Sequence, residues 1–333
     1  MKTKKRIITI IEILLVPVIV IVSITMVNTP KDHMWQGTAV EKISYSNVSE
    51  SDYMDIYLPD SENPCPLIII VHGGGFFSND SQSTEAEYMY NYFRSKGYAC
   101  ASINYRLSGE AVFPAAVSDI KAAIRFLHAN ASIYNLDETR FAIWGESAGA
   151  YLATMAAVTG EDEFKDVSFH GEDETEETSS EVYALIDFYG PMEFHTMDEQ
   201  FNQLGIPDVL RKITGVSENG LTGDCDSPES LFVGKTITQL SDEEKEMISP
   251  FTYVRKNLNG NSNLKVYIRH GKMDITVPYL QSKDLAEELS QALGSEAVDF
   301  DLFTSYKHAD ARFYLDKNLD NVVTFLNQTT SSK

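Results

Sequence analysis

The pentapeptide around Ser147 carries the strongest chemical signal in this sequence. Residues 145–149 read Gly-Glu-Ser-Ala-Gly, after the short apolar run 140–144 and before a helical pattern that continues to about residue 158. Glycines two positions on either side remove the Cβ atoms that would clash in a sharp strand–turn–helix bend, so the serine hydroxyl stands clear of the sheet. No other serine of the chain has this context, and Ser147 is our candidate nucleophile.

A glycine loop at residues 72–75, His-Gly-Gly-Gly, supplies the second signal. It follows the continuous apolar run 67–71, which is typical of a buried central strand. Consecutive glycines let the backbone approach a substrate closely and aim its N–H groups at it. The N–H groups of Gly74 and Gly75, with that of Ala148 at the start of a helix, are therefore a candidate oxyanion hole. A glycine-rich turn without a chemical role is the alternative interpretation.

The order of elements selects a base and an acid for this serine. In proteins with such a nucleophile turn, the chain runs serine, acid, histidine. Of the seven histidines, only His308 follows the late strand patterns, so we assign it as the base. Asp274 follows the predicted strand 264–270, one strand–helix unit before the histidine, and is the preferred acid. Asp187, at the end of an earlier predicted strand, is the runner-up. Together such groups perform acyl transfer through a covalent intermediate.

The elements that must position these groups alternate along the chain from about residue 39 to 330. Strand patterns alternate with amphipathic helical patterns, which predicts an α/β fold with a mostly parallel central sheet and helices on both faces. The predicted strands are 53–58, 67–71, 98–105, 140–144, 182–188, 264–270 and 298–303, and the predicted helices are 84–96, 116–130, 148–158, 278–293 and 310–327.

Two segments interrupt this alternation. Residues 160–181 are crowded with Glu and Asp and have little apolar content, which indicates a flexible acidic loop. Residues 192–256 are irregular and partly helical, and they lie between a strand and the next strand–helix unit. We interpret them as a lid-like insertion over the catalytic face, with a simple surface insertion as the alternative.

The net charge and the N-terminal sequence indicate which partners and which cellular location to expect. The formal net charge is −22, from 49 acidic and 27 basic residues, and such a field repels nucleic acid and anionic lipid. Basic residues nevertheless begin the chain, before an apolar run at about residues 7–27 that is long enough to span a bilayer as a helix. We expect residues 1–27 to be a transmembrane anchor, with a cleaved signal peptide as the alternative. Residues 28–38 would then be a linker, and the domain 39–330 would lie outside the cytoplasm.

The three cysteines show no metal-binding spacing. Cys65, Cys100 and Cys225 lack a CxxC partner, so zinc is not indicated. Cys65 and Cys100 lie at or within predicted strands, where buried free thiols are the simplest interpretation. A Cys65–Cys100 disulfide is the alternative.

Several motifs together resemble those of a known family. The chain is similar to the bacterial esterase/lipase family related to hormone-sensitive lipase, in the branch that includes acetyl-xylan and feruloyl esterases. The resemblance covers about residues 53–327 and rests on residues 72–75, 104–108, 145–149, 187–191 and 270–278. It implies an α/β-hydrolase fold and the triad and oxyanion roles assigned above. Asn104, Glu146 and Ala150 depart from residues common in the wider family.

These observations predict a serine carboxylic-ester hydrolase that forms an acyl-enzyme on Ser147. We expect short-chain acyl or carbohydrate-linked esters as substrates, and no metal or organic cofactor. An amidase, a formamidase or an exported peptidase with the same triad is the alternative within hydrolases. A non-catalytic binding protein is the alternative outside them, and the intact set of candidate residues argues against it. Aromatic residues near the motifs are candidates for lining an acyl or sugar pocket, with burial in the core as the alternative: Phe76, Phe77, Tyr151, Tyr189 and Tyr306.

Overall fold

The computed structural model describes residues 38–330, apart from residue 83 and the segments 172–177 and 259–262. By its contacts the chain divides into Met1–Met34 and Trp35–Lys333, and only the second unit contains described residues. The predicted anchor 1–27 and all but the last residue of the linker 28–38 lie outside them. Within the described segments, no helix is both long and apolar enough to cross a membrane.

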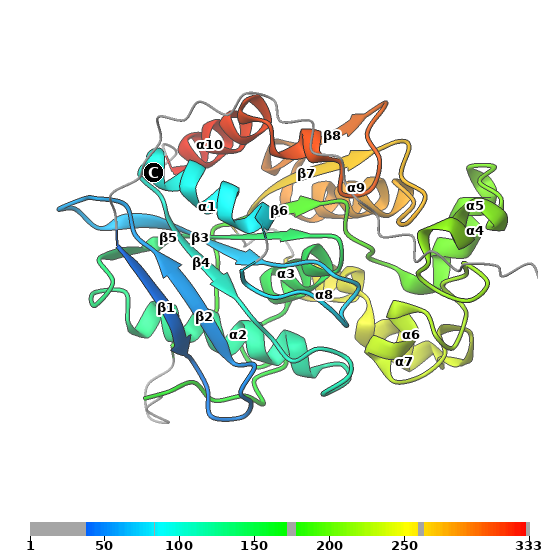
Figure 1. The fold of residues 1–333 in the computed structure, drawn as a ribbon, viewed down its shortest axis with the longest axis horizontal. Coiled ribbons are helices and arrows are strands. Elements are labelled where there is room, and N and C mark those ends of the chain that lie inside the picture. Colours follow the sequence, from blue (N-terminus) through cyan, green and yellow to red (C-terminus); the bar gives the residue numbers. More distant parts are fainter. Residues whose placement is uncertain (1–37, 83, 172–177, 259–262, 331–333) are drawn as a thin grey trace, which may run out of the picture. The chain divides into compact units, whose positions relative to one another are not determined.

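One sheet of eight strands forms the centre of the domain (Figure 1). Its spatial order is β1-β2-β4-β3-β5-β6-β7-β8, and all pairs are parallel except β1 with β2 and β2 with β4. The carboxyl ends of the parallel strands therefore share one edge of the sheet. The strands are β1 (Ala39–Ser44), β2 (Tyr53–Tyr57), β3 (Cys65–Val71), β4 (Ala99–Ile103), β5 (Leu136–Glu146), β6 (Ala184–Phe188), β7 (Lys265–Gly271) and β8 (Val298–Phe303).

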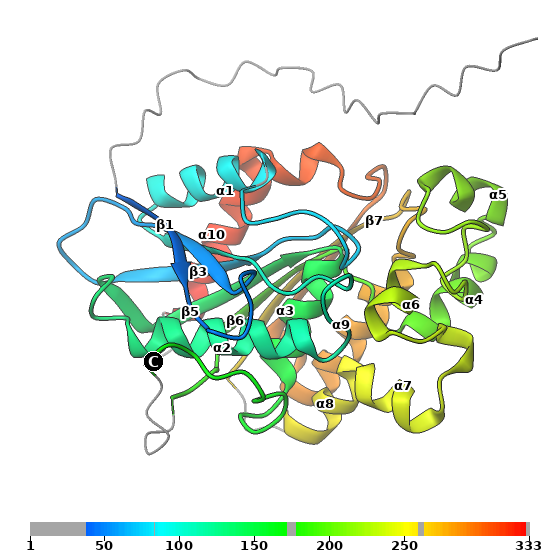
Figure 2. The same cartoon turned by 60° about the horizontal axis from the view of Figure 1, so that its bottom comes forward.

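Helices cover both faces of this sheet. Figure 2 shows α1 and α10 on one face, and α2, α3, α8 and α9 on the other. The helices are α1 (Thr84–Ser95), α2 (Ala115–Ala129), α3 (Ala148–Val158), α4 (Met197–Gln203), α5 (Asp208–Arg211), α6 (Pro228–Val233), α7 (Asp242–Ile248), α8 (Pro250–Asn257), α9 (Leu280–Leu293) and α10 (Asp316–Thr330). The predicted α/β class with a mostly parallel, doubly covered sheet is confirmed.

The predicted elements differ from the observed ones mainly at their ends. β1 was not among the predicted strands because its sequence, Ala-Val-Glu-Lys-Ile-Ser, is largely exposed at the sheet edge and lacks a clear apolar alternation. β5 begins at Leu136, four residues before the predicted apolar run. The predicted helix 310–327 is replaced by a short 3-10 turn, Ala311–Tyr314, and then α10.

The core has two halves, separated by the sheet. Alternate residues of β3 point to opposite sides, so Leu67 and Ile69 pack with α2 and α3, while Ile68 packs with α1 and α10. The same alternation puts Cys65 in the first half and Cys100 in the second, both buried as free thiols. The alternative of a disulfide between them is therefore wrong, because the sheet lies between the two side chains.

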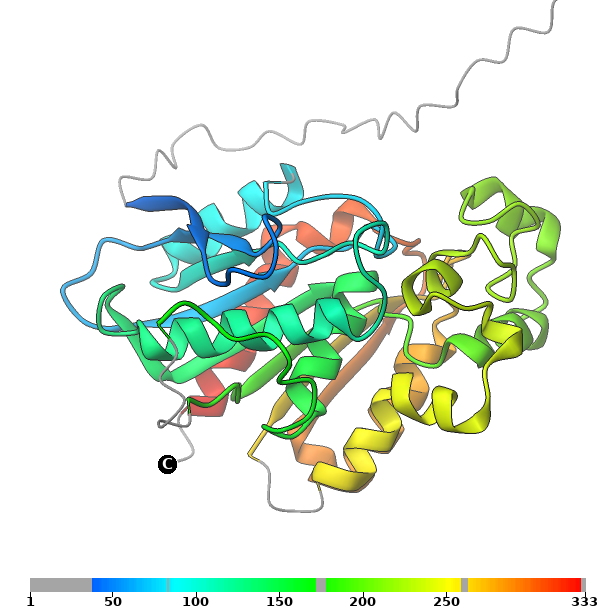
Figure 3. The ribbon, with the colours of Figure 1, turned by 90° about the horizontal axis from the view of Figure 1, so that it is seen from below.

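The insertion 192–256 packs tightly against the domain rather than forming a loose surface loop. It contains α4 to α7 and meets the sheet near the carboxyl ends of the strands, as seen from below in Figure 3. Phe194 and Phe232 from the insertion pack with Phe76 and Tyr151, and the Phe76 and Phe232 rings stack with centroids 4.2 Å apart. The position over the catalytic face agrees with the lid interpretation, whereas movement of the insertion stays a prediction.

The flanks of the acidic loop 160–181 are held by hydrogen bonds. Both carboxylate oxygens of Glu161 accept hydrogen bonds from the backbone N–H of Ser180, at 3.0 Å each, and Lys121 donates to the Glu163 carbonyl at 2.5 Å. The first two bonds join the two flanks of the loop, and the third ties one flank to α2. The flexibility of the loop stays a prediction.

Candidate active site

Ser147 lies on a strained turn between β5 and α3. Its φ of +52° is unusual for a residue other than glycine. A Cβ on Gly145 would lie 2.1 Å from the Gly149 carbonyl oxygen, and a Cβ on Gly149 would lie 2.2 Å from that of Val71. Both glycines are thus required sterically. The Ser147 N–H donates to the Phe188 carbonyl at 2.9 Å, which fixes the turn to the end of β6.

His308 reaches this serine from the loop after β8. Its Nε2 lies 2.9 Å from the Ser147 Oγ, and its Nδ1 lies 2.7 Å from the Asp274 Oδ2. Because a carboxylate only accepts hydrogen bonds, Nδ1 carries the proton and Nε2 presents its lone pair to the serine hydroxyl. This is the tautomer that a general base needs.

Asp274 lies beyond the end of β7 and is fully buried. Its Oδ1 accepts hydrogen bonds from the N–H groups of Thr276 and Val277 at 2.8 and 2.9 Å, and its Oδ2 accepts from His308. Burial alone would raise the pKa of this carboxyl. The positive charge that His308 carries when it is protonated, together with the hydrogen bonds that Asp274 accepts, outweighs burial, so the pKa of Asp274 lies well below its ordinary value.

His270 is a participant whose role the sequence did not reveal. It is fully buried at the end of β7, and its Nε2 lies 3.2 Å from the Asp274 Oδ2 and 3.1 Å from the Val277 carbonyl oxygen. Its Nδ1 lies 2.7 Å from the Ser282 Oγ on α9. His270 therefore contacts the same carboxylate oxygen as His308 and helps to fix its position. Its spacing of four residues from Asp274 was the available signal, but no pattern distinguished it from a buried core histidine.

The alternative acid, Asp187, is turned away from the base. It ends β6 and is fully buried, with its Oδ2 accepting a hydrogen bond from the Thr154 hydroxyl at 3.3 Å and its Oδ1 accepting from the Gly190 N–H at 3.2 Å. Burial raises its pKa to about 6. His308 bonds Asp274 instead, so the geometry favours Asp274 for the acid position.

The glycine loop faces the serine turn across a tight contact. A Cβ on Gly73 would lie 3.3 Å from that of Ser147. Gly74 has a φ of +113°, and a Cβ there would lie 2.2 Å from the Ser78 carbonyl oxygen, so only glycine fits. The N–H groups of Gly74, Gly75 and Ala148 donate to no acceptor among the described residues. These three donors are free for an oxyanion beside Ser147.

Glu146, one of the departures from the family pattern, belongs to a cluster with two tyrosines beneath the base. The Tyr314 hydroxyl donates to its Oε2, as does that of Tyr189 at 3.3 Å, and the two hydroxyls lie 2.7 Å apart. The Tyr189 ring meets the His308 ring edge-to-face, with centroids 5.0 Å apart. The cluster therefore supports the position of the imidazole.

Glu229, on α6, is a second residue that the sequence did not single out. Its exposed fraction is 8%, and the hydrogen bond to its carboxylate comes from its own backbone N–H. Burial, with a smaller contribution from the charge of Asp198, raises its pKa to about 7, although its own backbone N–H, Arg211 and His308 act in the opposite direction. Among the described residues, no side chain forms a hydrogen bond or an ion pair with Glu229. The insertion thus places a buried acid close enough to His308 for their charges to interact.

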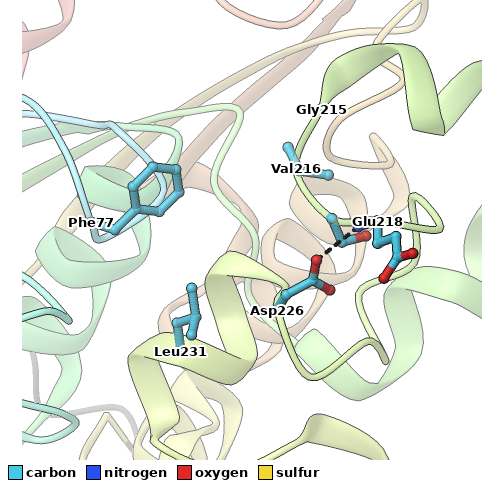
Figure 4. Close-up of a pocket in the computed structure, with 7 residues that line it drawn as sticks. Phe77, Gly215, Val216, Glu218, Asp226 and Leu231 are labelled. Carbon is cyan, nitrogen blue, oxygen red and sulfur yellow. Dashed lines mark hydrogen bonds between the residues drawn. The ribbon is translucent and has the colours of Figure 1, made fainter.

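Of the candidate pocket aromatics, only Phe77 is largely exposed. Phe76, Tyr151 and Tyr189 are at most 1% exposed and belong to the core, whereas Phe77 is 51% exposed and Tyr306 is partly buried. Phe77 lines a cavity at the boundary between the glycine loop and the insertion (Figure 4). The core interpretation thus holds for three of these five residues.

Comparison with known proteins finds similarity to esterases. The BD-FAE family matches residues 54–289. A probable carboxylic ester hydrolase of Mycobacterium tuberculosis, LipM, is 24% identical over 268 residues, which are 79% of this chain and 55% of that protein. The chain thus spans about half the length of this relative.

Solved structures share the fold over most of the chain. A truncated carbohydrate esterase from gut microbiota superposes with a TM-score of 0.72 and 26% identity, covering 90% of this chain and 99% of the other. A thermophilic esterase from Thermogutta terrifontis superposes with a TM-score of 0.63 and 20% identity, covering 86% and 93%. The predicted α/β-hydrolase fold and the resemblance to this esterase group are confirmed.

Proposed function

The chain belongs to the BD-FAE family, and from that premise we propose that it is a serine carboxylic-ester hydrolase. The observation that carries the proposal is the continuous chain of hydrogen bonds from Ser147 through His308 to Asp274. Further support is that the N–H groups of Gly74, Gly75 and Ala148 donate to no acceptor among the described residues, as the proposed oxyanion hole requires. The relatives named as esterases support the same reaction class.

The proposed reaction proceeds in two acyl-transfer steps. His308 takes the proton of Ser147 as the serine oxygen attacks the ester carbonyl, and Asp274 stabilises the resulting imidazolium. The N–H groups of Gly74, Gly75 and Ala148 hold the negative charge that develops on the carbonyl oxygen. Each such donor is worth about 2.7–4 kcal/mol of barrier stabilisation. His308 then protonates the departing alcohol, and a water molecule activated by the same base hydrolyses the acyl-enzyme.

We propose carbohydrate-linked esters with short acyl groups as the substrate class. The support is the 26% identical solved relative, which is described as a carbohydrate esterase and is covered almost completely by the alignment. A comparison of p-nitrophenyl esters of increasing acyl length with acetylated and feruloylated oligosaccharides tests this choice. Faster turnover of long-chain esters than of any glycan ester would contradict it.

Ser147→Ala tests the reaction itself. We expect this change to remove nearly all esterase turnover while leaving the thermal unfolding temperature near that of the parent, because the hydroxyl contributes to chemistry and little to packing. A fluorophosphonate probe should label the parent at Ser147 and leave the variant unlabelled. Undiminished turnover or labelling of the variant would show that another residue is the nucleophile.

We also propose that the domain works outside the cytoplasm, attached to a membrane by residues 1–27 or released after their removal. The support is the basic cluster followed by an apolar run in the sequence. Membrane fractionation combined with protease treatment of intact cells tests the location. Catalytic domain found only in the cytosol and protected from protease would contradict it.

A further inference from the structure

A cavity of about 360 Å³ lies beside the candidate active site. The loop after β3 forms one wall through Phe77, and the insertion forms the other through residues 215–218, Asp226 and Leu231. Figure 4 shows the Phe77 ring on one side, Val216 and Asp226 across from it, and Leu231 below on α6, while the Glu218 carboxylate points away from Phe77. We call this the 77/226 cavity. Its volume lies at the small end of the range for ligand sites.

The 77/226 cavity begins next to an oxyanion donor. A Cβ on Gly75 would lie 2.8 Å from the Cε1 of Phe77 and 3.4 Å from the Cβ of Pro228. Pro228 starts α6, the helix that carries Leu231 to the cavity. Gly75 thus lies between the aromatic wall and the helical wall. The cavity therefore adjoins the glycine loop, so a substrate bound at the candidate oxyanion hole has the cavity beside it.

The lining combines apolar surface with hydrogen-bond acceptors. Phe77 is 51% exposed and Leu231 45% exposed, although their neighbours Phe76 and Phe232 are buried in the core. The Asp226 Oδ2 accepts the Glu218 N–H at 2.9 Å, which fixes the orientation of that carboxylate. Among the described residues, no lysine or arginine pairs with Asp226 or Glu218. Both side chains are exposed, so their remaining lone pairs face solvent and can accept hydrogen bonds from the hydroxyls of a ligand.

This combination excludes two other occupants. An anionic ligand such as a uronate or a phosphate would meet two carboxylates in a protein of net charge −22. A purely aliphatic acyl chain would offer no hydrogen-bond donor to either carboxylate and would displace water from beside them, which disfavours it. A neutral sugar ring satisfies both halves of the lining, because its C–H face packs on an aromatic ring and its hydroxyls donate to carboxylates.

We propose that the 77/226 cavity is a subsite for a neutral sugar ring of the substrate. Phe77 provides the stacking surface, Asp226 accepts hydrogen bonds from the sugar hydroxyls, and Glu218 adds negative charge beside the cavity. The assignment rests on the proposed ester hydrolysis and adds which part of the glycan the protein recognises and with which residues. It also specifies that the glycan is uncharged at this position.

The test compares an acetylated xylo-oligosaccharide with p-nitrophenyl acetate, which has no sugar. For Phe77→Ala, we expect kcat/KM for the sugar ester, divided by kcat/KM for p-nitrophenyl acetate, to fall about tenfold. The loss should come from a higher KM for the sugar ester. Ile133→Ala is the matched control, because it removes another exposed apolar side chain, between α2 and β5, and should leave the ratio unchanged. Circular dichroism verifies that both variants fold.

Charge and inhibition give two further readouts. Glu218→Gln should weaken discrimination against an acetylated uronate oligosaccharide by several-fold, since it removes one repelling charge. Unacetylated xylobiose should inhibit p-nitrophenyl acetate hydrolysis by the parent more strongly than by Phe77→Ala.

Failure of the subsite and failure of the proposed reaction give different results. If the parent hydrolyses neither ester, the proposed reaction is wrong. If it hydrolyses p-nitrophenyl acetate, but Phe77→Ala lowers both substrates equally or changes only the preference for acyl length, the sugar subsite is overturned. The subsite is also overturned if uronate and neutral oligosaccharides are used equally well by the parent and by Glu218→Gln.

Discussion

Replacing Asp274 by asparagine changes a carboxylate that has no spare acceptor position. Its Oδ1 accepts two backbone N–H groups at 2.8 and 2.9 Å, and its Oδ2 lies 2.7 Å from the His308 Nδ1 and 3.2 Å from the His270 Nε2. An asparagine must put its NH₂ group at one of these two positions. The backbone donors cannot rearrange, so the amide oxygen will face them and the NH₂ will face the histidines.

That orientation reverses the tautomer of the base. With an NH₂ group opposite it, the His308 Nδ1 must accept a hydrogen bond, and the proton moves to Nε2, which then points at Ser147. In this state His308 cannot take the serine proton. We expect kcat to fall about ten-thousandfold, the loss seen when a triad aspartate becomes asparagine in a serine protease. This equals about 5 kcal/mol of activation free energy.

Asp187→Asn is the matched comparison, since Asp187 is equally buried at the end of the neighbouring strand. The Thr154 hydroxyl that donates to its Oδ2 can turn and accept from an amide instead. We therefore expect kcat to change by less than about tenfold. Steady-state hydrolysis of p-nitrophenyl acetate, with thermal unfolding as the check on folding, measures both variants. If Asp187→Asn lost most of its kcat while Asp274→Asn kept it, both the assignment of Asp274 and the tautomer argument would be refuted.

Two further predictions concern buried groups around the triad. His270→Ala removes the hydrogen-bond partner of Ser282 and one of the partners of Asp274, so the unfolding free energy should fall by roughly 1–3 kcal/mol and kcat should fall with it. A denaturant midpoint and a kcat equal to those of the parent would show that this contact is dispensable. Glu229 has a pKa of about 7 when folded and about 4.3 when unfolded, so the folded state binds the extra proton and stability falls as pH rises between these values. The unfolding free energy of the parent should therefore fall by roughly 3 kcal/mol more than that of Glu229→Gln between pH 4.5 and 7.5. Parallel curves for the two proteins in denaturant titrations across this range would contradict the raised pKa.

The sequence alone determined the parts of the site that depend on local geometry. The Gly145–Gly149 spacing identified Ser147 because a strand-to-helix turn of this kind excludes Cβ atoms at both glycines, and the clashes at 2.1 and 2.2 Å are the physical form of that rule. The parallel sheet followed from the alternation of strands and helices. His308 followed from chain order. Each of these signals lies within a few residues or in the order of elements along the chain.

Contacts between distant segments could be decided only by the tertiary structure. Asp187 and Asp274 both follow buried strands, and the choice between them depends on which carboxylate the loop after β8 brings within 2.7 Å of His308. The free thiols of Cys65 and Cys100 likewise depend on the faces of the sheet to which the two side chains point. No local sequence pattern encodes the distance between Asp274 and His308 or the sheet faces on which Cys65 and Cys100 lie.

The features of the insertion that form the proposed sugar subsite also could not be predicted from the sequence. Its sequence predicted a segment over the catalytic face, but the exposure of Phe77, the burial of Glu229 and the cavity between Phe77 and Asp226 follow from how α6 packs on Phe76 through Phe232. The candidate nucleophile depends on short-range steric constraints, which the sequence displays directly. The candidate acid and the proposed sugar subsite depend on packing between segments distant along the chain, which only the folded structure specifies.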